Sequence, residues 1–342
     1  MINRLVWMET DNTYPYRNLA MEEYMTLHVP QGTCILYLGQ NRHTVVIGKN
    51  QNCWRECRVN FLEQENGYLV RRLSGGGAVF HDLGNLNFTF IVGAGDYDVS
   101  RQLDVILEAV RSLGIHAEKT GRNDITVDGR KFSGNAFYRT GDGCYHHGTI
   151  LIRADKENMS RYLNVSKEKL ASKGVTSVKS RVANLCEFKP DITLEEVKSA
   201  LVEAFSKVYG QPAVRMEEGE LPQPDIDART EKFASWQWKY GRKIPFEYEM
   251  EKRFPWGNIQ IQFHVDEGMI QDVNVFSDAM DQEMIGMLAE QLKGCAYAEE
   301  DICRAVKAVG TDAFQAGEYT GADEPQSCRI KEDIMTLVRE SL

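Results

Sequence analysis

The sequence predicts an α+β protein of two domains. Strand-type alternation and helical periodicity both recur along the 342 residues, and a two-residue hairpin signal joins two of the strand patterns. The length exceeds the usual size of one domain. The composition changes near residue 248, so we expect one domain over 1–247 and a smaller one over 248–342.

The first half of the chain alternates between helical and strand patterns. A helix is expected over 18–28, with Asn18 as its N-cap and Pro30 beyond its end. An apolar stripe over 103–113 predicts a second helix that stops at Gly114. Short apolar or alternating runs predict strands at 34–38, 44–47, 68–73, 79–80, 86–90 and 124–127.

The next elements are marked by turn and capping signals. Asp128–Gly129 predicts a tight hairpin, and a further strand is expected over 145–153. Thr193 and Glu196 form a capping-box pattern at the start of a helix that ends at Gly210. The acidic stretch 219–230 holds two prolines and is expected to be a surface loop.

The second domain begins with a hairpin pattern. Residues 259–265 alternate apolar and polar side chains, a turn follows at 266–268, and 269–276 predicts the returning strand. Helical patterns fill much of 280–342. This domain shows no catalytic constellation in its sequence.

Composition excludes several classes of protein. The formal charge of −10 argues against a general nucleic-acid binder, whose affinity depends on Lys and Arg contacts to phosphate. The eight cysteines are scattered without a C-x-x-C pair, which argues against a disulfide scaffold or a zinc site. We expect no signal peptide and no membrane span, and we expect a monomer in a reducing cytoplasm.

The segment Arg71–Asn87 contains the strongest ligand signal. Three consecutive glycines follow Arg71, Arg72 and Ser74, so bare backbone N–H groups lie beside fixed positive charge. This combination is typical of an anion cradle. A glycine-rich turn between two strands, with solvated arginines, is the alternative that the segment alone leaves open.

A second cluster lies at 120–136. Strand periodicity predicts one face that carries Lys131, Ser133, Asn135, His147 and Thr149. A lysine on a rigid strand can stabilise charge on a reacting carboxylate and phosphate. A solvated sheet face is the alternative.

Two further groups of residues complete the candidate site. Asn123 and Asp124 could hold a ribose or Mg²⁺, with Asp124 the better metal ligand because magnesium prefers oxygen. The segment 172–184 contains Lys173, Lys179 and Arg181 among small residues. It is typical of a basic loop that closes on a charged ligand, or of an ordinary solvated loop.

These motifs together resemble lipoate–protein ligase over essentially the whole chain. Five of them occur in the family's order, at Arg71–Asp82, Gly121–Asp124, Asp128–Ala136, His146–Leu151 and Lys173–Leu185. Further matches occur at Asn18–Glu23, Thr44–Asn52, Ser235–Trp238 and Arg253–Gly257.

The resemblance implies a catalytic domain like that of biotin and lipoate ligases, with a mixed sheet and flanking helices, plus a small α/β C-terminal domain. It implies that ATP and Mg²⁺ activate lipoate as lipoyl-AMP, which then modifies a lysine of an acceptor domain. The acceptors implied are lipoyl domains of 2-oxoacid dehydrogenase E2 subunits and the glycine-cleavage H protein.

The resemblance also implies residue roles. Lys131 is the catalytic residue, which touches both lipoate and nucleotide. The implied ATP contacts are Arg72, Gly77, Ala78, Val79, Phe80, Lys131, Asn123 and Asp124. The implied lipoate contacts are Lys131, Gly75, Gly76, His81, Ser133, His147 and Thr149. The loop that holds Lys173, Lys179 and Arg181 would close over the adenylate and exclude water.

Two other functions remain open from the sequence. An ATP-independent octanoyl- or lipoyl-transferase would use a cysteine acyl-enzyme, for which Cys144 is the candidate near the site. A non-catalytic lipoate-binding protein would tolerate loss of Lys131. Gly39 stands where relatives often carry Trp, which leaves the preferred acyl chain open.

Overall fold

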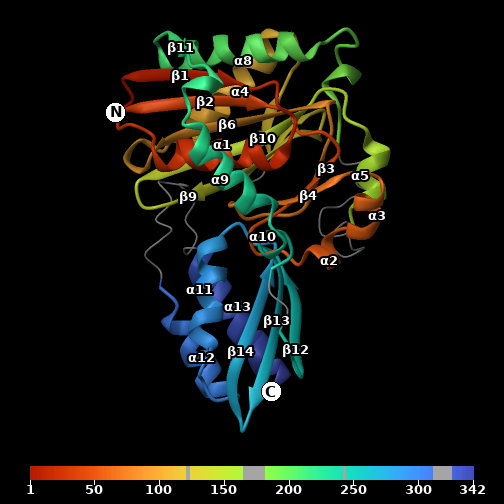
Figure 1. Ribbon diagram of the computed structural model, residues 1–342, viewed down its shortest axis with the longest axis vertical. Coiled ribbons are helices and arrows are strands. Elements are labelled where there is room, and N and C mark those ends of the chain that lie inside the picture. The colour runs from red at the N-terminus through yellow and green to blue at the C-terminus, as the bar shows by residue number, and fades with distance from the viewer. Residues whose placement is uncertain (121–123, 165–181, 242–243, 311–325) are drawn as a thin grey trace. The chain divides into compact units, whose positions relative to one another are not determined.

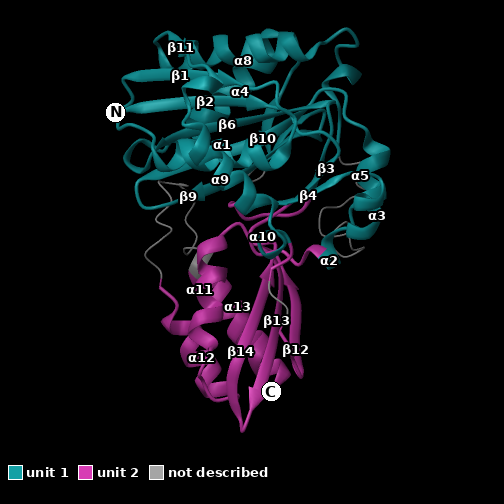
Figure 2. Cartoon of the chain, in the orientation of Figure 1, with its two compact units in different colours: residues 1–46, 54–72, 79–239 teal, residues 47–53, 73–78, 240–342 magenta. Residues whose placement is uncertain are grey.

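The computed structural model describes residues 1–120, 124–164, 182–241, 244–310 and 326–342. These residues form two compact units (Figures 1 and 2). Unit 1 comprises 1–46, 54–72 and 79–239, and unit 2 comprises 47–53, 73–78 and 240–342. The structural division falls at Tyr240, and two short earlier segments also belong to unit 2. The domain boundary that the sequence predicts between residues 247 and 248 stays a prediction.

Unit 1 is built on an eight-stranded mixed sheet in the order β11-β1-β2-β6-β10-β9-β8-β7. Strands β11, β1 and β2 are parallel to one another, and every other neighbouring pair is antiparallel. The strands are β1 (Arg4–Glu9), β2 (Thr33–Gly39), β6 (Asn85–Gly93), β7 (Glu118–Thr120), β8 (Asp124–Val127), β9 (Arg130–Arg139), β10 (Gly143–Leu151) and β11 (Ala213–Arg215). The predicted α+β class with a mixed sheet is confirmed.

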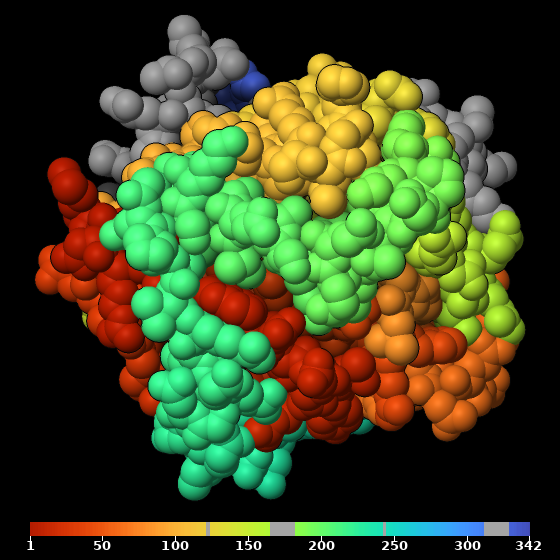
Figure 3. Space-filling model, turned by 90° about the horizontal axis from the view of Figure 1, so that it is seen from above, coloured from red at the N-terminus to blue at the C-terminus, as the bar shows by residue number. Residues whose placement is uncertain are grey.

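Helices cover both faces of this sheet. On one face α4 (Val99–Ser112) and α8 (Leu194–Tyr209) pack against each other and against the strands, and their apolar side chains form the main core. On the other face lies α1 (Pro15–Leu27), which contacts β6 and β10 and is itself covered by α9 (Gln223–Ala234). Figure 3 shows the chain after α8 running across the red N-terminal residues.

A smaller sheet and short helices complete unit 1. The order of the small sheet is β4-β3-β5. Its strands are β3 (Thr44–Ile47), β4 (Tyr68–Arg71) and β5 (Val79–His81). The remaining helices are α2 (Cys53–Glu56), α3 (Val59–Gln64), α5 (Lys156–Tyr162), α10 (Trp236–Tyr240) and the 3₁₀ turns η1 (Ala94–Asp96), η2 (Leu185–Glu187) and η3 (Glu218–Glu220).

Unit 2 contains an antiparallel sheet of three strands with helices packed on one face. The strands β12 (Tyr248–Phe254), β13 (Gly257–Asp266) and β14 (Met269–Ser277) pair in sequence order. The helices α11 (Gln282–Leu292), α12 (Glu299–Ala308) and α13 (Gln326–Ser341) share a core with them. The predicted hairpin and C-terminal helices are confirmed.

Turn and capping signals were reliable predictors. Asp128 and Gly129 both adopt positive φ, of 50° and 71°, as the hairpin requires. Thr193 and Glu196 form the expected capping box, and Gly210 ends α8 in the left-handed conformation. Each of these features depends on neighbours in sequence, which explains the success.

Two sequence predictions about helices are wrong. Helix α1 begins at Pro15 with Tyr14 as its N-cap, so Asn18 lies inside the helix. Proline fits the first turn of a helix because its missing N–H would have no helical partner there. The same preference explains α9, in which residues 223–230 of the expected loop are helical and Ile226 is buried.

Among the described residues, no helix is both long enough and apolar enough to cross a membrane.

Candidate functional site

One face of the large sheet carries two rows of polar side chains. Directly paired residues of an antiparallel sheet point to the same face. The register therefore puts Asp124, Gly134, Thr149 and Asn87 in one row. The neighbouring row contains His147 and Thr89. We call this side of the sheet the α1 face, because Glu22 of α1 contacts it.

A β-bulge in β9 decides which residues lie on the α1 face. Ile125 pairs with Ser133, but the next residue, Thr126, pairs with Lys131, so one residue of β9 is left over. The bulge reverses the alternation and turns Lys131 onto the α1 face.

The predicted common face is therefore partly wrong. Lys131, His147 and Thr149 share the α1 face, whereas Ser133 and Asn135 lie on the opposite, core face. Ser133 is fully buried there, and Asn135 is hydrogen-bonded to His146. A side-chain contact from Ser133 to a ligand on the α1 face does not fit this geometry.

Lys131 is held by charge and by the local backbone. Its Nζ lies 2.5 Å from Oδ1 of Asp124, with about a fifth of each side chain exposed. An added Cβ at Gly134 would come within 2.6 Å of the same Nζ, so glycine at this position leaves room for the lysine stem. The backbone N–H of Ala183 also donates to the Lys131 carbonyl at 2.8 Å. The ammonium is thus pre-positioned on a rigid strand.

Glu22 joins α1 to the α1 face. Its Oε1 lies 2.9 Å from Nδ1 of His147 and accepts from the Thr89 hydroxyl at 2.7 Å. The carboxylate is buried, and its Oε2 has no hydrogen-bond partner among the described residues. A buried carboxylate requires partners of this kind.

The two arginines before the glycines have different roles. Arg71 donates to the backbone carbonyls of Trp238 and Lys239, so its guanidinium caps α10. Arg72 is buried, and burial lowers its pKa to about 10, with Tyr145 and Glu22 opposing that shift through their charge. Arg72 is therefore the arginine that adds charge beside the α1 face.

His81 lies near the same charges. Burial, with electrostatic effects of Arg72 and His147, lowers its pKa to about 3, so the ring is neutral at physiological pH. Its Nδ1 contacts Nδ2 of Asn41 at 3.2 Å, and its Nε2 is buried with no hydrogen-bond partner among the described residues.

The glycine triplet has packing demands of its own. Segment 73–78 belongs to unit 2, where the N–H of Gly76 donates to the carbonyl of Ala279 at 3.1 Å. A Cβ at Gly75 would lie 2.5 Å from that carbonyl oxygen, and Gly76 has a φ of +86°. Close backbone approach and positive φ therefore explain Gly75 and Gly76 without a ligand.

The other predicted nucleotide contacts differ in the unit to which they belong and in their burial. Gly77 and Ala78 also belong to unit 2, whereas Val79 and Phe80 are in unit 1. Val79 is exposed, and Phe80 is buried and stacks on Tyr162. Phe80 can therefore offer a ligand its backbone rather than its ring.

Some predicted site residues lie outside the described residues, namely Asn123, Lys173, Lys179 and Arg181. The proposed magnesium ligand Asp124 is described, and its carboxylate is paired with Lys131. No group of three or more His, Cys, Asp or Glu side chains gathers as a metal site in the part of the chain that is described. The role of Asp124 as a magnesium ligand therefore stays a prediction.

Cys144 lies on the core face. It pairs with Val92, which pairs with Cys34, and all three side chains belong to the main core. The thiol of Cys144 is fully buried. It therefore points away from Lys131 and His147.

Sequence reasoning missed Glu22 and Asn41 as site residues. A signal for Glu22 was present, because two adjacent acids interrupt an apolar helix that is buried on almost every side. A buried acid in such a helix requires a polar partner across the interface. Asn41 lies in an irregular connection after β2, where nothing local marks it.

Comparison with known families agrees with this geometry. The family model described as the lipoyl protein ligase A/B catalytic domain matches residues 14–206. The chain belongs to this family. A second model, the bacterial lipoate protein ligase C-terminus, matches residues 243–321. The resemblance seen in the sequence is confirmed.

Solved structures of ligases share the fold. LipL1 of P. falciparum, in complex with lipoate, is 28% identical with a TM-score of 0.81, covering 97% of this chain and 99% of LipL1. The bipartite lipoate protein ligase of Thermoplasma acidophilum, from a structural analysis of that ligase and its E2 lipoyl domain, is 26% identical with a TM-score of 0.61, covering 71% of this chain and 99% of that one. A lipoate-protein ligase A bound with ATP is 24% identical, with a TM-score of 0.60 over 70% of this chain and 99% of that one, and supports the fold.

Proposed function

We propose that this ligase-family protein activates lipoate with ATP and then lipoylates a lysine of an acceptor lipoyl domain. In the first step a carboxylate oxygen of lipoate attacks the α-phosphorus of ATP, and pyrophosphate leaves. In the second step the acceptor amine attacks the acyl carbon, and AMP leaves with the electron pair of the broken bond.

The position of Lys131 carries this proposal. Its ammonium lies on the α1 face, backed by Asp124, with Thr149 in the adjoining strand. A fixed cation can stabilise the carboxylate and the α-phosphate as negative charge shifts between them. Because the bulge and the ion pair hold the charge in place, little reorganisation is needed when the substrates react.

The other assigned residues have supporting roles. We assign Arg72 and the backbone of Val79 and Phe80 to ATP. We assign His81, His147 and Thr149 to lipoate, without Ser133. Magnesium would enter with the ATP phosphates, which supply the oxygen ligands it prefers.

The burial of Cys144 supports a ligase over a transferase. A cysteine nucleophile must present an activated thiolate to its substrate. Cys144 instead lies in the main core, on the face opposite Lys131. A non-catalytic binding protein would have no need for a lysine held by a bulge, an ion pair and a glycine.

Two relatives support the substrate and the partner. LipL1 was solved with lipoate, and the Thermoplasma ligase belongs to a lipoylation system that includes its E2 lipoyl domain. We therefore propose lipoyl domains of 2-oxoacid dehydrogenases as acceptors, with the glycine-cleavage H protein as a second acceptor implied by the resemblance.

Mass spectrometry of acceptor domains tests the proposal. Incubation with the protein, lipoate, ATP and Mg²⁺ should add one lipoyl group, and omission of ATP should abolish the addition. Modification without ATP would identify a transferase. The absence of any modification, together with no lipoate-dependent ATP–pyrophosphate exchange, would refute the ligase assignment.

A further inference from the structure

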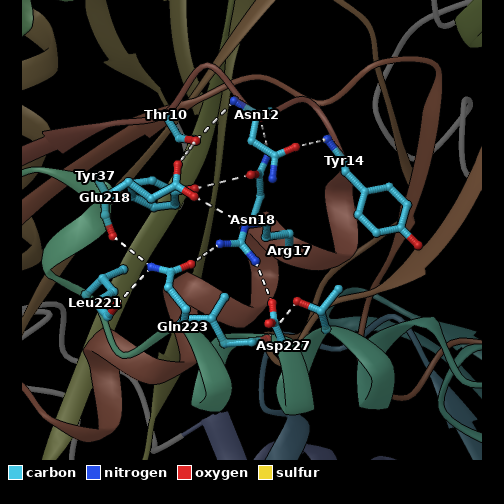
Figure 4. Close-up of polar contacts among 12 residues, drawn as sticks. Thr10, Asn12, Tyr14, Arg17, Asn18, Tyr37, Glu218, Leu221, Gln223 and Asp227 are labelled. Atoms are coloured by element: carbon cyan, nitrogen blue, oxygen red, sulfur yellow. Dashed lines mark hydrogen bonds and ion pairs between the residues drawn. The ribbon is translucent and has the colours of Figure 1, made fainter.

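A chain of hydrogen bonds between side chains runs from α1 to β5. Nδ2 of Asn18 lies 3.1 Å from the carbonyl oxygen of Asn12 and 2.9 Å from that of Gln40. The same nitrogen lies 2.9 Å from Oδ1 of Asn41. Figure 4 shows Asn18 between Asn12 and Tyr37 in this network.

Backbone carbonyls determine how both amides are oriented. A carbonyl oxygen can only accept, so the amide nitrogen of Asn18, and not its oxygen, must face Asn12 and Gln40. The Tyr37 hydroxyl faces the remaining Oδ1 of Asn18 at 3.4 Å. Asn41 must then present its oxygen to Asn18, which leaves its own amide nitrogen facing His81.

This orientation sets the tautomer of His81. Nδ2 of Asn41 donates to Nδ1 of His81 at 3.2 Å, so Nδ1 must carry the lone pair. The proton of a neutral imidazole is then on Nε2. Both side chains are more than nine-tenths buried, so water does not compete for these positions.

The Nε2–H group is a buried donor that lacks a protein acceptor among the described residues. Buried donors in folded proteins are nearly always satisfied, so an unmatched one requires an explanation. Arg72 is the charged neighbour whose positive charge acts on this ring. A donor beside a buried guanidinium suits an acceptor that carries negative charge.

We propose that Asn41, oriented by Asn18, is a positioning residue that holds His81 as an Nε2–H donor to an anionic oxygen of the substrate. The inference rests on the proposed function for the identity of that oxygen. It belongs either to the carboxylate of lipoate or to a phosphate of ATP. Asn41 itself touches neither and acts through the imidazole.

Asn41→Asp is the variant that tests the tautomer. A carboxylate can only accept, so it draws a proton onto Nδ1 of His81 while still accepting from Asn18. Long-range ¹⁵N–¹H NMR spectra distinguish protonated from bare imidazole nitrogens. We expect a bare Nδ1 in the wild type and a protonated Nδ1 in the variant. A protonated Nδ1 in the wild type would overturn the proposal.

Ligand binding is measured on the same proteins with each ligand alone. We expect Asn41→Asp to weaken one of them, lipoate or ATP, by about tenfold, the effect of losing one charge-assisted hydrogen bond. Weaker lipoate binding would identify the lipoate carboxylate as the acceptor of the His81 hydrogen bond. Weaker ATP binding would identify a phosphate as that acceptor. Unchanged binding of both ligands would overturn the proposal.

Asn135→Asp is a matched control on the opposite face. Asn135 is also buried and also contacts a buried histidine, but its Oδ1 accepts from Nε2 of His146 at 2.8 Å. An aspartate at this position keeps the acceptor, so the His146 tautomer and both ligand affinities should stay unchanged. Equal loss of affinity in the two variants would show that Asn41 only supports the structure, and it would overturn the proposal.

A double-mutant cycle with His81→Gln separates positioning from stability. The glutamine amide supplies an N–H donor, and because an amide has no tautomers, this donor does not depend on Asn41. In that background Asn41→Asp should cause no further loss of affinity, whereas an equal loss in both backgrounds would contradict the role assigned to Asn41. Binding and NMR need no turnover, so a protein that binds lipoate but fails ATP–pyrophosphate exchange would refute the ligase reaction and leave this test intact.

Discussion

The ammonium of Lys131 lies 2.5 Å from the carboxylate of Asp124, across the hairpin that joins β8 and β9. The bulge one residue after Lys131 makes this pair possible, since regular pairing would point the lysine toward the core. A charge held in this way is suited to a transition state rather than to a resting substrate.

Lys131→Ala should abolish most of the activation step. We expect lipoate-dependent ATP–pyrophosphate exchange to fall by about a hundredfold to a thousandfold, the range seen when one preorganised charge donor is removed. Asp124→Asn should cause a smaller fall, because it keeps the lysine and removes only its anchor. Exchange that persists in Lys131→Ala would overturn the catalytic role of the lysine.

Arg72→Ala should weaken ATP more than lipoate. The buried guanidinium is assigned to the nucleotide, so we expect the KM for ATP to rise by about tenfold or more and the Kd for lipoate to change less. Arg153→Ala, which removes an arginine that donates to the Pro190 carbonyl, serves as the control. Equal losses for both ligands would count against the assignment of Arg72 to ATP.

Cys144→Ala should retain full ligase activity. The thiol is buried in the core and burial excludes it from the α1 face, so its loss leaves the reacting groups in place. Thermal unfolding should show a decrease in stability, because a small cavity remains. Loss of acceptor modification in a variant that remains folded would instead favour the transferase.

Arg17→Ala should destabilise unit 1 by about 1–2 kcal/mol. Arg17 donates to Glu218, Gln223 and Asp227, and it thereby fastens α1 to η3 and to α9 (Figure 4). Urea denaturation measures the change. Lys207→Ala, which removes a largely exposed lysine that pairs with Glu108, should leave the free energy of unfolding nearly unchanged.

His146 should make the protein less stable in mild acid. Burial, with a smaller effect of His147, lowers its pKa from 6.5 to about 3, so the unfolded chain binds a proton that the folded protein excludes. The contribution of neutral His146 to the free energy of unfolding is fully present above pH 6.5. It decreases as the pH falls toward 3, by up to about 1.4 kcal/mol per pH unit.

His146→Phe tests that pH dependence. Phenylalanine keeps an aromatic ring among Phe88, Phe90 and Phe137 but cannot titrate. The slope of unfolding free energy against pH between 6 and 4 should therefore be smaller in the variant. An identical slope would show that other groups cause the acid sensitivity.

Local chemistry made much of this fold readable from the sequence. The Asp128–Gly129 turn, the Thr193–Glu196 capping box and the Gly210 stop were predicted because their partners lie within four residues. The loop predicted over 219–230 is partly the helix α9, because proline in an acidic stretch also fits the first turn of a helix. The family and its motifs were likewise apparent from residue order alone.

The sequence by itself determined the two classes of element, the turns, and the set of polar residues that could form a site. The tertiary structure alone decided which of those residues share a face. Strand periodicity assumes regular pairing, and one extra residue in β9 moved Lys131 to the face of His147 while Ser133 stayed in the core. The roles of Glu22 and Asn41 were also decided there, because a hydrogen bond between residues far apart in sequence leaves no local pattern.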